Sequence, residues 1–195
     1  LHYQRLLSDP EYLAALSRTG VFAVSVTVLS MVLGLAFAAA VDRLTRTGKV
    51  YTTLLVWPYA VAPVVAGILW WFLFNSTTGL MPFVLEKFGI DWDHDLNGTQ
   101  AMILIIVAAA WKQISYNFLF FLAGLQSVPQ SLMEAAAIDG SGPVKRFFTI
   151  SLPLISPTTF FLFIINVNYT MFDTFPIIDA TTVGGPAQAT TTLVY

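Results

Sequence analysis

Long apolar stretches alternate with short polar connectors along this chain. A helix that crosses the hydrocarbon core of a bilayer, about 30 Å thick, needs about 20 apolar residues. Four stretches meet this requirement, at residues 21–41, 50–74, 101–125 and 158–178. The pattern therefore predicts an all-α membrane protein, in which residues 1–195 form a single transmembrane domain with four membrane-spanning helices.

The composition supports this class of protein and excludes others. The 195 residues are 56% apolar and 10% charged, with a net charge of −2, whereas soluble domains carry about 25% charged residues. The weak negative charge argues against a nucleic-acid partner. The chain has no cysteine, and no pattern of metal-ligating or catalytic residues emerges. It also lacks the P-loop sequence that cradles ATP, so any energy source is expected in a partner.

The positive charges set the expected orientation in the membrane. Lysine and arginine are enriched in cytoplasmic loops, and here they gather in the first and third connectors. These residues are Arg43, Arg46, Lys49, Lys145 and Arg146. The second connector, residues 75–100, is acidic, and no lysine or arginine follows residue 178. We therefore expect the first and third connectors in the cytoplasm, and the final segment, residues 179–195, in the periplasm.

The third connector, residues 126–157, contains the sequence EAAAIDGSGPVKRFFTISLP from Glu134 to Pro153. Ser131 and Glu134 have the spacing of a capping box, Gly140 suits a left-handed helix end, and Pro143 suits the first position of a second short helix. An interfacial helix-turn-helix would explain these features. It would not explain why Ile-x-Leu-Pro follows at a fixed distance.

The spacing resembles the EAA loop of the permease subunits of ABC importers. The residues that match its fixed positions are Glu134, Ala135, Ala136, Gly140, Ile150, Leu152 and Pro153. In that family the loop docks into a cleft on a separate ATPase subunit. The resemblance therefore implies a coupling role for these seven residues and for Asp139.

The resemblance extends over nearly the whole chain, to the sugar-type branch and within it to glycerol-3-phosphate permeases. It rests on residues 57–75, 92–102, 111–132 and 172–195, the last with a Gly-Gly-Pro turn. It implies a MetI-like permease of the bacterial inner membrane with six spans. Four of them would be present here, and the chain would begin and end in periplasmic segments. The implied solute is glycerol-3-phosphate or a related glycerophosphodiester, carried into the cytoplasm.

The same resemblance implies a set of partners and no bond chemistry in this chain. The partners would be a second homologous permease, a dimeric ATPase, and a periplasmic or lipid-anchored solute-binding protein. ATP and Mg²⁺ would bind to the ATPase, and this chain would need no cofactor.

Polar residues within two of the apolar stretches are candidates for a solute pathway. Lys112 lies near the centre of the third stretch, where a lysine costs about 2.5–3.5 kcal/mol on insertion scales. At about 100° per residue, it shares one polar arc with Gln113, Ser115, Tyr116 and Asn117. In the fourth stretch, helical spacing places Asn166, Tyr169, Thr170 and Asp173 on one stripe. We take these residues, apart from Ser115, as the candidate pathway.

Structural roles compete with each of these interpretations. Lys112 would also be stabilised by binding backbone carbonyls and fixing the packing of helices, and the polar stripe would suit hydrogen bonds between helices. Pro58 and Pro63 should bend the second span, either for gating or for packing alone. At 1.5 Å per residue, Asp173 and Lys112 fall at different depths, so we expect no direct ion pair between them.

Three other functions remain open from the residues. The first is a permease for maltose-type oligosaccharides. The second is an ion-coupled secondary transporter that uses Asp173 and Lys112, and the third is a membrane enzyme. The last two do not explain residues 134–153, and co-purification of an ATPase would distinguish them from an ABC permease.

Overall fold

A computed structural model describes residues 8–43 and 48–195, and every regular element in those residues is a helix. Of the cations expected in the first connector, Arg46 lies outside the described residues. The elements are α2 (Pro10–Asp42), α3 (Gly48–Ala60), α4 (Pro63–Phe74), α5 (Leu80–Glu86), α6 (Gly98–Gln126), α7 (Gln130–Ile138), α8 (Pro143–Arg146), the π-helix η1 (Phe147–Ser151), α9 (Leu152–Leu154), α10 (Ser156–Phe172) and α11 (Phe175–Thr181).

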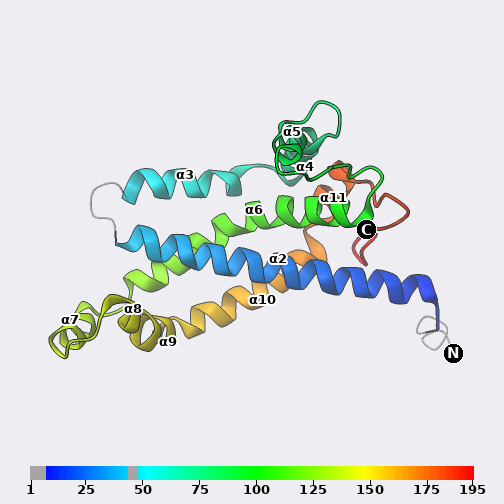
Figure 1. Cartoon of the computed structure of the whole chain (residues 1–195). Coiled ribbons are helices and arrows are strands. Elements are labelled where there is room, and N and C mark those ends of the chain that lie inside the picture. Colours follow the sequence, from blue (N-terminus) through cyan, green and yellow to red (C-terminus); the bar gives the residue numbers. More distant parts are fainter. Residues whose placement is uncertain (1–7, 44–47) are drawn as a thin grey trace.

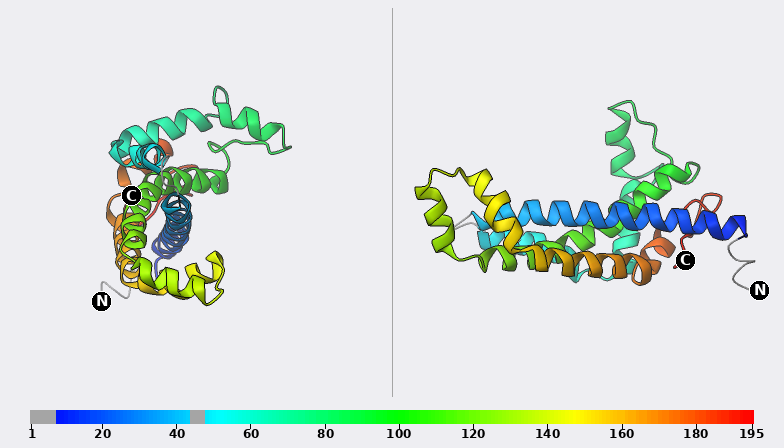
Figure 2. Two further views of the ribbon diagram at one scale, coloured as in Figure 1. Left: turned by 90° about the vertical axis from the view of Figure 1, so that its left-hand side faces the viewer. Right: turned by 90° about the horizontal axis from the view of Figure 1, so that it is seen from below.

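The long helices form a bundle with two different ends. α2, α6 and α10 run lengthwise, and α3 lies alongside them (Figure 1). One end carries α7, α8 and α9, whereas the other carries α4, α5, α11 and the C terminus (Figure 1). Figure 2 shows that α4 and α5 project to the side of the bundle. The loop at 126–157, which carries Lys145 and Arg146, and the acidic connector at 75–100 therefore lie at opposite ends, as the predicted orientation requires.

The core follows the interface between α2 and α6. Toward the α11 end, Phe22 and Val26 of α2 pack in one apolar cluster with Ile105 of α6. Toward the α7 end, Ala38 of α2 packs in a second cluster with Phe118 of α6. These side chains are fully buried, so the two helices hold each other along most of their shared length.

The two helices approach each other closely at Gly34 of α2. A Cβ atom at this position would lie 2.7 Å from Cβ of Asn117 and 3.1 Å from the backbone nitrogen of Phe118. Such distances are too short for a side chain, so the approach requires glycine. Small residues at helix crossings are typical of membrane proteins, where close van der Waals packing drives association.

Within the described residues, α2 and α6 are the two helices that are long and apolar enough to cross a membrane unbroken. α6 agrees with the predicted span at 101–125, but α2 starts well before residue 21. It starts at Pro10 because Asp9 caps it, accepting a hydrogen bond from the Glu11 N–H at 3.0 Å. At 1.5 Å per residue, its 33 residues extend about 50 Å, so this helix is longer than the hydrocarbon core.

The predicted second span is a bent pair of helices, α3 and α4, which meet at 101°. The break comes at Pro63, because proline has no N–H to continue the hydrogen-bond ladder. Pro58 lies within α3 and does not end it. The expected bend is therefore confirmed, and it occurs at the second proline.

The predicted fourth span, residues 158–178, is not one continuous helix. α10 ends at Phe172 and α11 begins at Phe175, with Pro176 in its first turn. A proline suits the start of a new helix and cannot continue an old one, which explains the break. α10 also meets the preceding short helices, Pro143–Leu154, at a 67° bend.

The close approach at Gly34 predicts a difference between two glycines of the same helix. Gly34→Ala should lower the free energy of unfolding by about 1–3 kcal/mol, because the new methyl group overpacks the α2–α6 interface. Gly20→Ala is the matched control, since a Cβ there would meet nothing within 4 Å. It should be neutral or stabilise the helix by up to about 1 kcal/mol. Thermal unfolding of the full-length protein in detergent measures both changes, and equal effects would contradict the packing argument.

Candidate functional site

The loop between α6 and α10 begins with α7, which ends at Ile138 and is followed by a turn at Gly140. This glycine has a φ of 77°, and its N–H donates to the Ala137 carbonyl at 3.0 Å. The Ser141 N–H donates to the Ala136 carbonyl at 2.9 Å. A Cβ at Gly140 would meet nothing within 4 Å, so the left-handed backbone, and not a lack of space, favours glycine here. The expected left-handed helix end is confirmed, as is Pro143 at the start of α8.

The start of α7 differs from the prediction. The helix begins at Gln130 after Pro129, and no side chain caps it. Ser131 therefore lies inside the helix, where its hydroxyl cannot serve as the cap, and the predicted capping box is wrong. Gln130 Nε2 instead donates to Glu134 Oε1 at 2.8 Å, one helical turn away.

Arg146 attaches α7 to the rest of the loop. Its Nη1 donates to the Met133 carbonyl at 2.9 Å, and the Ser151 hydroxyl lies 3.7 Å from the Met133 sulfur. Phe147 and Leu152 pack against the apolar cluster at this end of the bundle. Backbone and side-chain contacts therefore connect α7 to the helices through the segment that contains the Ile-x-Leu-Pro sequence.

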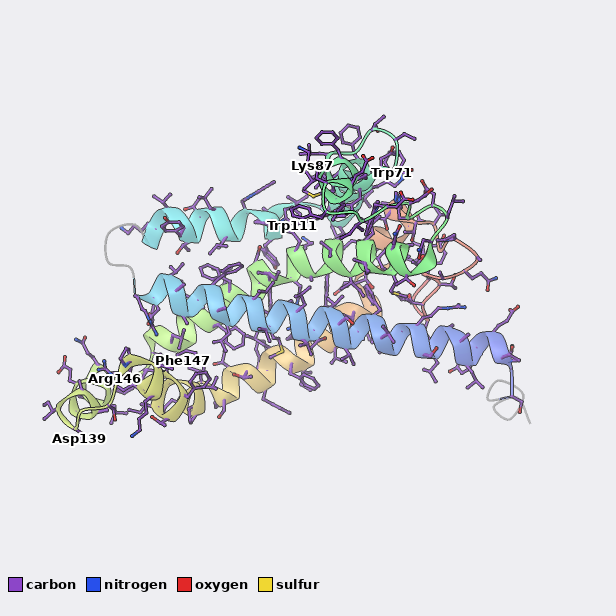
Figure 3. The ribbon with its side chains drawn as sticks, in the orientation of Figure 1. Trp71, Lys87, Trp111, Asp139, Arg146 and Phe147 are labelled. Atoms are coloured by element: carbon purple, nitrogen blue, oxygen red, sulfur yellow. The ribbon has the colours of Figure 1, made fainter. Side chains whose placement is uncertain are left out.

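The outer face of the loop is exposed and carries both charged and apolar side chains. Asp139 lies at the tip, farther from the bundle than Arg146 (Figure 3). Glu134 is exposed as well, and Ile138 and Val144 are 87% and 63% exposed. The remaining coupling candidates are Ala135 and Ala136 on α7, Ile150 in η1, and Pro153 in α9. The loop therefore offers a mixed surface of the kind that proteins use for contacts with partners.

A second candidate site is a pocket of about 660 Å³ between the α3–α4 break, α6, α10 and α11. Candidate pathway residues from two helices meet in it, namely Lys112, Gln113, Tyr116, Tyr169 and Asp173. Tyr59, Pro63, Ile165, Asn168, Phe172 and Pro176 complete the lining. No ion pair joins Lys112 to Asp173 in the described part of the chain, although both face the same space.

Lys112 reaches from α6 to the break between α3 and α4. Its Nζ donates to the carbonyls of Tyr59 at 2.8 Å and Val61 at 2.7 Å. The ammonium also lies 5.3 Å from the centre of the Tyr59 ring, within the range of a cation–π contact. The expectation that Lys112 binds backbone carbonyls is therefore confirmed, and its side chain lines the pocket as well.

The other candidate pathway residues lie between helices, outside the pocket. Asn117 Nδ2 donates to Asn166 Oδ1 at 3.0 Å, and Asn166 Nδ2 donates to Asn117 Oδ1 at 2.8 Å. Ser30 Oγ of α2 lies 2.9 Å from the same Asn166 oxygen. Thr170 is fully buried and donates to the Val167 carbonyl at 2.9 Å. Ser30, Asn117 and Asn166 therefore connect α2, α6 and α10, as expected for interhelical hydrogen bonding, whereas the Thr170 bond lies within α10.

Comparison with known families gives the chain its class. The model of a family described as the binding-protein-dependent transport system inner membrane component matches residues 21–192. The chain belongs to this family. Its loop, its pocket and its long helices all fall within the matched residues, and family membership makes it a multi-pass component of the inner membrane.

Members with named functions match the chain over its whole length. Proteins named sn-glycerol-3-phosphate transport system permease protein UgpA are 55% identical in Salmonella typhimurium (strain LT2) and 56% identical in Rhizobium meliloti (strain 1021) and Brucella abortus biovar 1, over 194 residues in each case. The alignments cover 100% of this chain and 66% of each relative. The chain therefore spans slightly less than two thirds of the length of these family members.

Solved structures show the same fold at lower identity. The bacterial alginate ABC transporter, crystallised in complex with an alginate pentasaccharide-bound periplasmic protein, contains a chain that matches with a TM-score of 0.84. The match has 20% sequence identity and covers 97% of this chain and 66% of the other. The predicted MetI-like permease fold is therefore confirmed.

Six lining residues were not in the predicted pathway, and the sequence contained a signal for the two polar ones among them, Tyr59 and Asn168. Tyr59 lies four residues before Pro63, so its carbonyl faces the missing N–H and needs another donor. Asn168 is a polar residue within the apolar fourth stretch, but it lies off the predicted stripe. The contact between Arg146 and the Met133 backbone carried no sequence signal, because any residue supplies a carbonyl.

The buried amide pair predicts a specific loss of stability. Asn166→Leu should lower the free energy of unfolding by about 1–3 kcal/mol, because the Asn117 amide loses its partner inside the bundle. The double variant, Asn117→Leu with Asn166→Leu, should cost less than the sum of the two single changes, because it removes both amides and leaves neither without its partner. Asn168→Leu, at an exposed position on the same helix, is the control for thermal unfolding. Equal losses from Asn166→Leu and Asn168→Leu would contradict the role of the amide pair.

Proposed function

We propose that this chain forms the core of a permease subunit that carries sn-glycerol-3-phosphate, or a related glycerophosphodiester, into the bacterial cytoplasm. One observation carries the proposal: 55% identity over the whole chain to permeases of the sn-glycerol-3-phosphate transport system. Such a subunit performs no bond chemistry. A separate dimeric ATPase, which binds ATP and Mg²⁺, supplies the energy.

The exposed loop is the proposed contact with that ATPase. Its tip extends beyond the end of the bundle (Figure 1), so the apolar Ile138 and Val144 have no helix of this bundle to cover them. Glu134 and Asp139 add negative charge to the same surface. A partner with an apolar cleft and basic residues at its rim would complement this surface, and the coupling role proposed for residues 134–153 follows.

The attachment through Arg146 supports the mechanical part of the proposal. A force on α7 reaches η1 and α9 through the Arg146–Met133 hydrogen bond and the packing of Phe147. From there it reaches α10, which begins directly after α9. The loop therefore suits the alternating-access motion expected of an importer, in which the ATPase drives opening toward either side.

The central pocket is the proposed solute pathway. Of the described residues that line it, Lys112 carries the single positive charge, and Gln113, Tyr116 and Asn168 supply neutral hydrogen-bonding groups. An anionic solute in a low-dielectric core needs such compensating donors. The proposed partners on either side of the pathway are a second homologous permease and a periplasmic or lipid-anchored solute-binding protein.

The complete importer reconstituted in liposomes tests the proposed solute. ATP-dependent uptake of sn-glycerol-3-phosphate or glycerophosphocholine should exceed uptake of maltose, because the pathway offers a cation to a phosphate group. Vesicles with an ATPase subunit that cannot hydrolyse ATP are the control. Uptake of maltose in preference to both phosphate compounds would assign the chain to the sugar permeases instead, and uptake without the ATPase would favour an ion-coupled transporter.

The left-handed backbone of Gly140 predicts a defect in coupling. Gly140→Ala should reduce ATP-driven uptake several-fold, because an alanine at positive φ costs about 1–2 kcal/mol and distorts the end of α7. Gly142→Ala is the matched control, since Gly142 has a φ of −66° and also has open space around its Cβ position. Uptake per assembled complex, measured beside ATP hydrolysis, separates lost coupling from lost assembly. Equal uptake by the two variants would contradict the coupling role of this turn.

A further inference from the structure

The break between α3 and α4 leaves backbone carbonyls without their usual donors. In a continuous helix the N–H of residue 63 would bond to the carbonyl of Tyr59, but Pro63 has no N–H. The chain at Ala62 is extended, with φ −60° and ψ 141°. The carbonyl end of α3 therefore lacks donors from its own helix, and an unpaired polar group at membrane depth is unfavourable.

Lys112 fills this gap from a different helix. Its ammonium donates to the carbonyls of Tyr59 and Val61 at 2.8 and 2.7 Å. A positive charge at the C-terminal end of a helix is also favoured by the helix dipole. An ammonium group has three donors, so two hold the break and one remains for the pocket that the same side chain lines.

The break separates two pairs of helices. α3 packs mainly on α6, whereas α4 packs mainly on α11. Gly67 of α4 lies so close to α11 that a Cβ would fall 2.7 Å from Cβ of Ala180 and 3.1 Å from the Ile177 carbonyl. α4 and α11 are therefore closely packed partners, and any change in the bend moves this pair relative to α3 and α6.

We propose that Lys112 is an anion-sensitive clamp on the break between α3 and α4, which we call the joint. With the pocket empty, its ammonium holds the bend between α3 and α4. A phosphate group in the pocket first accepts from the free donor. Its remaining oxygens then compete with the two carbonyls for the ammonium, because hydrogen bonds between two charged groups are stronger than those to neutral carbonyls. The carbonyls of Tyr59 and Val61 are then released, and the joint changes its angle.

This inference rests on the proposed function for the identity of the anion, and it adds a consequence for gating. A ligand shifts a conformational equilibrium only as far as it binds the two states differently. Here the two states differ in the position of the Lys112 ammonium. It binds the carbonyls of Tyr59 and Val61 in one state and the phosphate of the solute in the other. The phosphate that identifies the solute would thus also loosen the helix that borders its pathway.

Spin labels on the two sides of the joint test the clamp. Leu54 on α3 and Phe72 on α4 are both well exposed, and the chain has no cysteine of its own, so Leu54→Cys with Phe72→Cys gives one labelled pair within this chain. In the complete importer in nanodiscs, the distance distribution should be narrow without solute. It should broaden and shift with sn-glycerol-3-phosphate but not with glycerol, which lacks the phosphate.

Variants of the clamp should change the response in a defined way. Lys112→Met should give the broad distribution without solute and no further response to it, whereas Lys112→Arg should retain part of the response. Lys49→Met, at an exposed position on α3, is the control and should behave as wild type. Pro63→Ala restores the missing N–H and permits a straighter helix. Lys112→Met should therefore alter the distance distribution less in a Pro63→Ala protein than in the wild type.

The outcomes separate the clamp from the proposed transport. A merely structural lysine would give a broad distribution in Lys112→Met but no response of the wild type to sn-glycerol-3-phosphate. Uptake of sn-glycerol-3-phosphate without any change in the wild-type distances would therefore overturn the clamp and leave the proposed function intact. If uptake fails but Lys112→Met still alters the distances in the absence of solute, the proposed identity of the solute is wrong. The proposal that Lys112 holds the bend between α3 and α4 is then retained. Identical distances in wild type and Lys112→Met would overturn that hold as well.

Discussion

The close crossing of α2 and α6 at Gly34 is the constraint on which the rest of the arrangement depends. In a membrane, lipid chains solvate apolar side chains as well as neighbouring helices do, so helices associate through close packing and buried polar contacts. Gly34 allows α2 to approach the backbone beside Asn117. Asn117 in turn pairs with Asn166, which fixes α10 against the same point. Three helices are thereby set in register.

The two candidate sites lie on either side of this fixed crossing. Beyond it in one direction, Phe118, Leu125 and Ile155 form the cluster that supports the loop. In the other direction, Lys112 and Tyr169 face the pocket. The proposed coupling surface and the proposed pathway therefore share two continuous helices, α6 and α10, so a displacement at the loop has a direct route to the pocket through the packed interior.

The sequence predicted some local features and missed others, and it left the pairing of distant side chains open. The left-handed turn at Gly140 and the helix start at Pro143 follow from backbone preferences, and both were predicted. The predicted capping box was wrong because the helix begins directly after Pro129, so Ser131 lies inside the helix and cannot cap it. The pairing of Asn117 with Asn166 could not be assigned in advance, since a polar stripe fits a pathway and a helix interface equally well. Apolar length alone also merged α10 with α11, because hydropathy does not detect the break before Pro176.

The contact between Lys112 and the main chain has a consequence for how this joint can evolve. The acceptors are the carbonyls of residues 59 and 61, which every amino acid carries, so the side chains at those positions are free to vary without loss of the bond. Selection would act on the cation and on Pro63, which creates the vacancy that the cation fills. Correlated substitution between contacting side chains, the usual sign of proximity in aligned sequences, would therefore overlook this contact. A lysine and a proline far apart in the chain would instead be kept or lost together.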